Sequence, residues 1–285
     1  MRILIAIAVM LWAPLAQAET LRIASWNIEH LVAGTDSGCR PRSAADFQRV
    51  RDVIDQVDAD IWLLQEIESA AALARVLDGA EWVVHIEERR PRRSYPECRH
   101  TPGQSLSFQA AAIVIRRDVA HRRLPDLKAL DVSGRGSLRH GVLIELTGSR
   151  PLTILNTHLK SGCFEGSGRQ ACGDLFAQLP VLRSWYGAQN RPVLIGGDLN
   201  RRLEVTNDIF WAVLNEYNDL HIAGAGIRPN CLPQYREFID FLILNDAANA
   251  AKKKRSFAET TFTGDLAEFP SDHCPIAVDI DLRGL

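Results

Sequence analysis

Short apolar runs separated by polar turns and amphipathic segments make up most of the chain. Runs of four to eight apolar residues, many of them β-branched, are typical of buried strands. Such runs predict strands at 60–66, 82–86, 110–116, 140–147, 151–157, 192–195, 238–244 and 276–280, and alternation that then turns apolar predicts a strand at 21–26. The run at 82–86 precedes an arginine-rich loop, so we expect it at a sheet edge.

Apolar residues at helical spacing predict helices at 43–57, 70–77, 170–185 and 207–214. Ser43 and Asp46 have the spacing of a capping box at the start of the first helix. The strands at 140–147 and 151–157 form a predicted hairpin through Gly148-Ser149-Arg150. A hairpin together with helical crossovers favours an α/β fold with mixed sheets over one all-parallel sheet.

The first residues have the features of an export signal. Met1-Arg2 is followed by an almost wholly apolar run from Ile3 to Leu15, and Ala16-Gln17-Ala18 has the small-x-small pattern of a cleavage site. We predict a signal peptide at 1–18, cleaved after Ala18, and one domain at 19–285, secreted or periplasmic. The alternative is a retained N-terminal anchor helix. The run is short of the about 20 residues that span a membrane, so we expect no stable membrane insertion.

All six cysteines follow the predicted cleavage site, which suggests up to three disulfides in an oxidising compartment. Cys163 and Cys172 flank a short polar loop, and we predict a bridge between them. No pair has the CxxC spacing of a zinc site. The pairing of the others stays open.

Composition changes the picture little, because 46% hydrophobic and 24% charged residues are ordinary for a soluble globular protein. The formal charge of −2 becomes about −3 without Arg2, which excludes a globally basic nucleic-acid coat. Two local basic clusters remain, at 89–99 and at Lys252 to Arg255. Each is either solvated loop charge or a contact for a phosphate backbone. We expect a monomer.

The strand at 192–195 leads through Gly196-Gly197 to Asp198 and Asn200. A carboxylate and an amide two residues apart in extended chain point the same way, which suits a hard cation beside a phosphate oxygen. Gly-Asp-x-Asn is also a common turn, so this stretch alone does not decide the function.

Other predicted strands also end in polar residues. Strand ends of open α/β folds meet at one rim, where ligands bind. We therefore expect one site containing Asn27, Glu66, His158, Asp198, Asn200, Asp272 and His273.

These blocks, in this order, resemble the endonuclease/exonuclease/phosphatase superfamily, which includes pancreatic-type deoxyribonuclease. The matching blocks span nearly the whole mature chain: Ser25-Trp26-Asn27, Leu64-Gln65-Glu66, Asn156-Thr157-His158-Leu159, Gly197-Asp198-Leu199-Asn200, Ile239-Asp240-Phe241 and Ser271-Asp272-His273-Cys274-Pro275. The resemblance implies a four-layer α/β sandwich, with two mixed sheets face to face, helices outside, and one site across their upper edges.

Hydrolysis of a phosphodiester needs a cation to absorb charge in the transition state. Glu66 and Asp272, with Asn27 beside them, offer hard oxygen ligands, which favour Mg²⁺, Mn²⁺ or Ca²⁺. The resemblance implies that Asp198 orients the attacking water or, with Asn200, holds a second cation. It also implies that Asn200 binds the phosphate.

His273 is the candidate general base, with Asp240 fixing its tautomer. Alternatively, Asp240 pairs with a local basic residue such as Arg236. His158 is expected to act as general acid or phosphate-binding cation, unless it is a core histidine. Secreted deoxyribonucleases support the corresponding histidine with a glutamate, where this chain has Gln109.

No motif surrounds the remaining histidines that we considered, and we interpret them as incidental: His85, His100, His121 and His140. The function we expect is an exported, metal-dependent nuclease acting on DNA or RNA. A phosphodiesterase or phosphatase for lipid headgroups or small phosphates could use the same residues. A binding module that has lost its chemistry is the third hypothesis.

Overall fold

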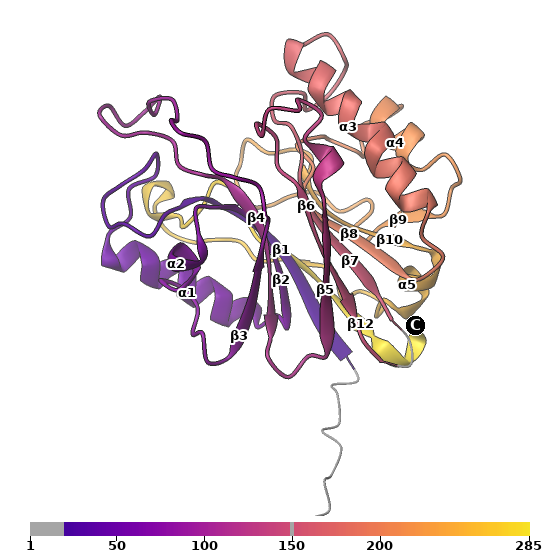
Figure 1. The fold of residues 1–285 in the computed structure, drawn as a ribbon. Helices are drawn as coiled ribbons and strands as arrows, with labels where there is room; N and C mark the ends of the chain where they lie inside the picture. Colours follow the sequence, from indigo (N-terminus) through magenta and orange to yellow (C-terminus); the bar gives the residue numbers. More distant parts are fainter. Residues whose placement is uncertain (1–19, 149–150) are drawn as a thin grey trace, which may run out of the picture.

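The computed structural model describes residues 20–148 and 151–285, and the predicted signal peptide lies outside them. Two six-stranded mixed sheets pack face to face (Figure 1). The strand order of the first sheet is β11-β12-β1-β2-β4-β3, and that of the second is β5-β6-β7-β8-β10-β9. This arrangement confirms the sandwich of two mixed sheets.

The first sheet is built around the parallel pair β1 and β2, with antiparallel neighbours on both sides. Its strands are β1 (Thr20–Leu31), β2 (Ile61–Ile67), β3 (Trp82–Ile86), β4 (Ala110–Arg116), β11 (Ala258–Glu259) and β12 (Ile276–Asp281). β3 is an edge strand, as predicted.

The second sheet is built around the parallel pair β7 and β8. Its strands are β5 (His121–Leu127), β6 (Gly141–Leu146), β7 (Thr153–His158), β8 (Val193–Asp198), β9 (Leu220–Ile222) and β10 (Asp240–Asn245). β6 and β7 pair antiparallel, which confirms the hairpin, although Ser149 and Arg150 of its turn lie outside the described residues.

The helices lie on the outer faces of the sheets (Figure 1). They are α1 (Ala44–Val57), α2 (Ala70–Leu73), α3 (Gln170–Gly187), α4 (Ile209–Leu214) and α5 (Asp246–Ala251), with 3₁₀ turns η1 (Lys128–Leu130), η2 (Leu266–Glu268) and η3 (Leu282–Gly284). Ser43 and Asp46 form the predicted capping box of α1. None of the described helices is long and apolar enough to cross a membrane.

The core between the sheets is mainly apolar, with the amides of Gln65 and Asn156 and the hydroxyl of Ser25 buried in it. Fully buried residues such as Leu63 and Ile195 fill the interior, and burial of this apolar surface is the main stabilising term. Within it, the side-chain amide of Gln65 donates to Asn156 Oδ1 at 2.8 Å. Asn156 in turn donates to the carbonyls of Leu64, at 2.9 Å, and Ala112, at 2.8 Å. Asn156, although part of a matching block, therefore fastens the sheets together.

All six cysteines are paired, and the predicted Cys163–Cys172 bridge is confirmed. The other two, Cys39–Cys98 and Cys231–Cys274, join residues 59 and 43 positions apart. Such closures of long loops restrict the unfolded chain most. Three disulfides suit an oxidising compartment.

Several predicted elements were wrong in their bounds. The helix expected at 70–77 is the single turn α2, and the strand expected at 21–26 continues to Leu31 in β1. Asp240 is the first residue of β10 and not its middle, because Phe238 and Ile239 are apolar but precede the strand. The sequence pattern missed β5, β9, β11 and α5.

Candidate active site

The parallel strands β1, β2, β7 and β8 run toward one end of the sandwich. The antiparallel β10 and β12 must begin where these neighbours end, as the pairing of Asp240 with Asp198 shows. Six strand ends therefore meet at this rim.

β1 is irregular at the rim, since Glu29 and His30 have φ angles of 52° and 55°. Left-handed backbone is unfavourable for such residues and needs support. Arg42, which is buried, supplies it: its guanidinium donates to the carbonyls of Glu29 at 3.0 Å and His30 at 3.3 Å. It also donates to Ile28 O at 2.6 Å and to Pro270 O at 2.8 Å. Arg42 thus fixes the β1 irregularity to the segment before β12.

Glu66, near the end of β2, also has a positive φ, of 62°. Its Oε2 accepts the backbone N–H of His30 at 3.1 Å and lies 3.3 Å from His30 Nδ1. Burial raises the pKa of Glu66, but its neighbours His30, Arg139 and His273, together with the hydrogen bond from the His30 backbone, lower it overall. Glu66 is therefore an ionised oxygen donor in the pocket.

Asp198 ends β8 directly after Gly197, whose φ is 127°. A Cβ at Gly197 would collide with the carbonyl of Thr157, so only glycine fits there. Asp198 accepts hydrogen bonds from Asn27 Nδ2 at 3.1 Å and from the Asn200 backbone at 2.8 Å. Burial and the neighbouring Asp240 raise the pKa of Asp198 to about 7.

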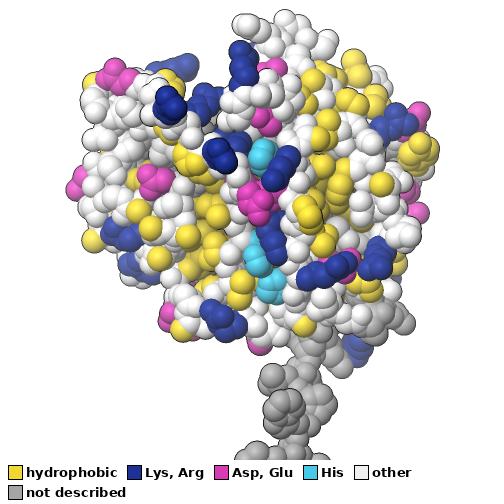
Figure 2. All heavy atoms as spheres, viewed as in Figure 1, with side chains coloured by type: hydrophobic (Ala, Val, Ile, Leu, Met, Phe, Trp, Pro, Cys, Tyr) yellow, Lys and Arg dark blue, Asp and Glu magenta, His cyan; other side chains and the backbone are white. Residues whose placement is uncertain are grey.

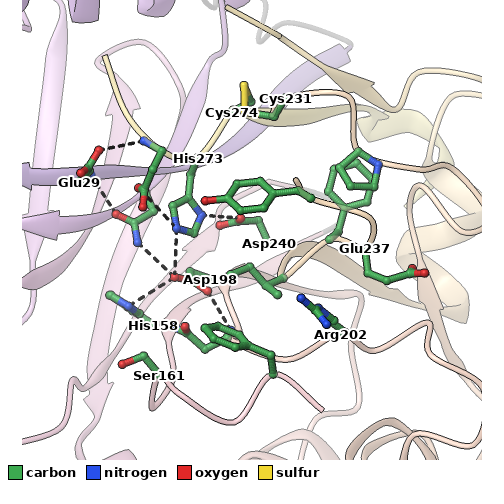
Figure 3. Close-up of a pocket in the computed structure, with 18 of the residues that line it drawn as sticks. Glu29, His158, Ser161, Asp198, Arg202, Cys231, Glu237, Asp240, His273 and Cys274 are labelled. Carbon is green, nitrogen blue, oxygen red and sulfur yellow. Dashed lines mark hydrogen bonds and ion pairs between the residues drawn. A yellow bond between two sulfur atoms is a disulfide. The ribbon is translucent and has the colours of Figure 1, made fainter. Parts of the chain in front are cut away.

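His273 and Asp240 form the predicted pair, with His273 Nδ1 2.7 Å from Asp240 Oδ2 (Figure 3). The alternative partner Arg236 is not used. His273 Nε2 lies 4.0 Å from Asp198 Oδ2. Burial lowers the pKa of His273, but Asp240 and Asp198 raise it well above its ordinary value.

The segment before β12 is held to β1 by several hydrogen bonds. Trp26 Nε1 donates to His273 O at 2.8 Å, and Ser271 Oγ donates to Asn27 O at 2.7 Å. The backbone N–H of Asp272 donates to Glu29 Oε2 at 2.9 Å. The Asp272 side chain is half exposed, with Oδ1 3.8 Å from His273 Nε2.

His158 ends β7 and is buried. Its Nε2 lies 3.5 Å from Asp198 Oδ2 and 4.0 Å from Glu66 Oε1. Burial, then Arg139, lower the pKa of His158 well below its ordinary value, and Nδ1 has no hydrogen-bond partner among the described residues. The side chain of Gln109 contacts His30 at 3.0 Å and Arg139 at 3.0 Å, so it does not support His158.

One pocket of about 340 Å³ is lined by all the site residues expected from the sequence: Asn27, Glu66, His158, Asp198, Asn200, Asp240, Asp272 and His273. The incidental histidines lie outside it. Sequence reasoning missed other lining residues, notably Glu29, His30 and Tyr235. Glu29 could have been found, because it follows Asn27 at strand spacing; the loop residue Tyr235 carries no such signal.

The donor set fits a hard divalent cation, because carboxylate and amide oxygens dominate it. The metal-ligating atoms of Asp198, Asp240 and His273 all lie within 4.8 Å of one another. Two buried carboxylates this close leave negative charge that a cation would offset, and Asp240 Oδ1 has no hydrogen-bond partner among the described residues. Glu66 and Asp272 border this cluster in the same pocket.

The two basic clusters lie at different ends of the molecule. The loop 87–109 follows β3 at the rim of the pocket, where Arg89 donates to Gln109 O at 3.2 Å. Lys252, by contrast, pairs with Ile280, which is opposite Leu21 at the start of β1. Of the two interpretations left open for Lys252 to Arg255, contact with a phosphate backbone beside the site does not fit, because β12 carries this cluster to the far end.

A buried carboxylate–imidazole pair beside a second carboxylate and hard oxygen donors has the chemistry that metal-dependent hydrolysis of phosphoesters needs. The sequence profile of the Endonuclease/Exonuclease/phosphatase family matches residues 24–273, and the chain belongs to this family. A comparison with curated proteins found no match.

Solved structures share the fold. Truncated Caenorhabditis elegans TDP2 matches with a TM-score of 0.59 at 17% identity, over 92% of this chain and 98% of that one. The human Nocturnin catalytic domain with bound sulfate matches with a TM-score of 0.57 at 14% identity, over 93% of this chain and 94% of that one. AP endonuclease LMAP from Leishmania major matches with a TM-score of 0.55 at 12% identity, over 92% of this chain and 88% of that one.

Proposed function

We propose that residues 19–285 form one domain of an exported, divalent-metal-dependent nuclease that hydrolyses phosphodiester bonds in DNA or RNA. The observation that carries this proposal is the meeting of the His273–Asp240 pair with Asp198 in the pocket that Glu66 also lines. Three disulfides and the N-terminal signal pattern support export to the periplasm or beyond.

In this proposal Glu66, Asp272 and Asn27 hold Mg²⁺, or Mn²⁺ or Ca²⁺, and Asp198 with Asn200 is the place for a second ion. A bound cation would neutralise charge on the phosphoryl group. The raised pKa of His273 falls once the charge of the surrounding carboxylates is offset, and Nε2 is then free to take a proton from water.

Asp240 holds the His273 ring through Nδ1, which directs Nε2 toward Asp198. Asp198 orients the attacking water, and Asn200 binds the phosphate. The lowered pKa of His158 favours a neutral ring, so we assign it a hydrogen bond to the phosphate rather than a permanent charge. The arginine-rich loop 87–109 at the rim supports a nucleic-acid substrate. Figure 2 shows Lys and Arg side chains, with Asp or Glu and His side chains among them, along the middle of the face where the two halves of the molecule meet.

A substrate panel tests the proposal. The secreted protein is incubated with plasmid DNA, RNA, sphingomyelin and a chromogenic phosphodiester, each with Mg²⁺ and with EDTA. We expect cleavage of nucleic acid that EDTA abolishes and added Mg²⁺ restores. Turnover of sphingomyelin alone would indicate a lipid phosphodiesterase, and no turnover of any substrate would indicate a binding module.

A further inference from the structure

The pocket wall that faces Asp198 from the side of the second sheet is a loop. It covers residues 223–239, between β9 and β10, and it contributes Tyr235 to the lining of the pocket that contains Asp198 and Asn200. None of the roles proposed above uses this side chain.

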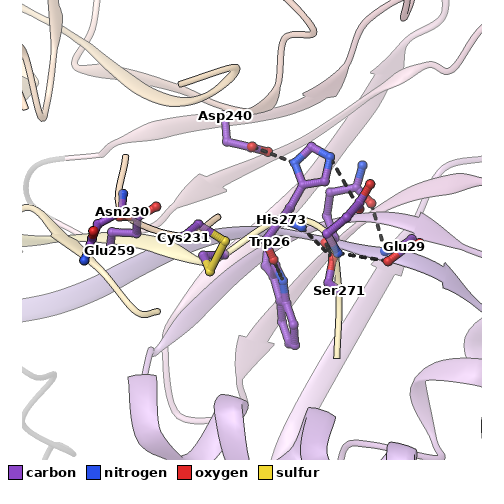
Figure 4. Close-up of a disulfide and its surroundings, with 11 residues drawn as sticks. Trp26, Glu29, Asn230, Cys231, Asp240, Glu259, Ser271 and His273 are labelled. Carbon is purple, nitrogen blue, oxygen red and sulfur yellow. Dashed lines mark hydrogen bonds and ion pairs between the residues drawn. A yellow bond between two sulfur atoms is a disulfide. The ribbon is translucent and has the colours of Figure 1, made fainter. Parts of the chain in front are cut away.

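Three kinds of contact fix this loop over the site. The Cys231–Cys274 disulfide joins it to the residue after His273, and the Asn230 backbone donates to Glu259 Oε2 at 2.7 Å (Figure 4). Leu232 belongs to a small buried apolar cluster with Phe269. Because Cys274 and Glu259 belong to the first sheet's side, the loop bridges both sheets and holds Tyr235 in place.

The Tyr235 hydroxyl is available to a substrate. The residue is 37% exposed, and its hydroxyl makes no hydrogen bond within the described part of the chain. Burial, and then the charges of Asp272 and Glu29, raise the pKa of Tyr235 to about 12. The phenol therefore keeps its proton at physiological pH and can only be a neutral donor or acceptor, which suits contact with an anion in a site rich in carboxylates.

We propose that Tyr235 is a further catalytic residue whose hydroxyl donates a hydrogen bond to a non-bridging oxygen of the scissile phosphate. This inference rests on the proposed phosphodiester hydrolysis. Negative charge at the phosphoryl oxygens must be stabilised in the transition state, and a donor already fixed in position does so without reorganisation. The disulfide-held loop supplies that fixed position.

The test is Tyr235→Phe, which removes the hydroxyl and keeps the ring. We expect kcat on the best nucleic-acid substrate to fall about 10²-fold, with the KM and the thermal midpoint nearly unchanged. Tyr217→Phe is the matched control, since Tyr217 is 65% exposed and does not line the pocket. On a series of aryl phosphodiesters whose leaving groups differ in acidity, Tyr235→Phe should lower kcat by the same factor for every substrate.

Two results would overturn the inference. Full activity of Tyr235→Phe, with loss only in Tyr235→Leu, would mean that the ring stacks on the substrate and the hydroxyl is idle. A loss that grows as the leaving group becomes less acidic would make the hydroxyl an acid for the departing oxygen. Failure of the proposed function is distinct from both, because the unaltered enzyme would then cleave no phosphodiester.

Discussion

The two sheets have the same strand order and the same directions. In each, a parallel central pair is joined through a helix, α1 for β1 and β2 and α3 for β7 and β8. Antiparallel strands follow in matching positions, so that β12, β4 and β3 correspond to β6, β10 and β9. The backbone pattern is therefore common to both halves.

The chemistry at the strand ends differs. The central pair of the first sheet reaches the rim at Asn27 and Glu66, an amide and an ionised carboxylate, whereas that of the second ends in His158 and Asp198, an imidazole and a carboxylate with a raised pKa. In the proposed function, Asn27 and Glu66 help to hold a cation, whereas His158 contacts the phosphate and Asp198 orients the attacking water. Equivalent backbone positions thus carry different side chains, and the halves meet directly at the His273–Asp240 pair and at the hydrogen bond from Asn27 to Asp198.

The largest expected effect comes from variants that separate proton transfer from cation binding. His273→Ala should lower kcat by about 10³- to 10⁴-fold at any Mg²⁺ concentration, because the base is lost. Glu66→Gln should instead raise the Mg²⁺ concentration needed for half-maximal rate, and saturating Mg²⁺ should restore part of the activity. Initial rates over a Mg²⁺ series measure both. Equal rescue of the two variants would contradict the division between cation binding by Glu66 and proton transfer by His273.

The arginine-rich loop at the rim gives the second test. Loop 87–109 of the first sheet carries Arg90, Arg92 and Arg93, which are exposed and make no ion pair with any described residue. Replacing all three by Ala should weaken binding to duplex DNA about tenfold and reduce the slope of log K against log salt by up to about 3. Fluorescence anisotropy over a salt series measures this slope.

Alanine substitutions at Lys252, Lys253 and Lys254 are the control, since that cluster lies at the far end of the sandwich. They should leave the salt slope nearly unchanged. A larger effect of these lysines than of the arginine loop would place the nucleic acid elsewhere.

The smallest effect concerns the seam where edge strands β3 and β5 meet. His85 Nε2 lies 2.8 Å from His121 Nε2, and burial and His121 lower the pKa of His85 to about 4. The unfolded chain then binds more protons than the folded one between about pH 6.5 and 4, so stability falls as pH falls through this window.

His85→Gln should remove this fall in the free energy of unfolding at low pH. We set the fall at about 1 kcal/mol, because the side chain is partly exposed. Urea unfolding at pH 7.5 and pH 4.5 measures it, with His221→Gln as the control on the exposed His221–Asp246 pair. If His85→Gln and His221→Gln both keep the full pH dependence of stability that the unaltered protein shows, His85 is not the source of that dependence.

Much of this architecture could be predicted because strands buried on both faces leave continuous apolar runs, and polar residues at their ends stand out. The edge strand β5, with the sequence His-Arg-Arg-Leu-Pro-Asp-Leu, has no such run, since only Asp126 of its residues is buried. Phe238 and Ile239 show the opposite error: they are apolar loop residues, and periodicity alone cannot separate them from a strand.

The parts of the site that escaped prediction depend on backbone geometry and topology. The left-handed turn at Glu29 and His30 is imposed by contacts with Arg42, which no local pattern reveals. The position of Lys252 follows from its pairing with β12. The Cys163–Cys172 bridge was visible because it is local, whereas the two long-range bridges required the fold.

The amide pair of Gln65 and Asn156 has a consequence for any exchange of halves between relatives. Apolar faces tolerate small displacements against each other, but the Asn156 amide must meet two specific carbonyls of the opposite sheet. A chimaera that inherits only Gln65 or only Asn156 would bury an amide without its hydrogen-bond partner. It would also lose the fixed position of one sheet on the other, which brings the two rims together. The two sheets are therefore interchangeable modules only if Gln65 and Asn156 travel with them.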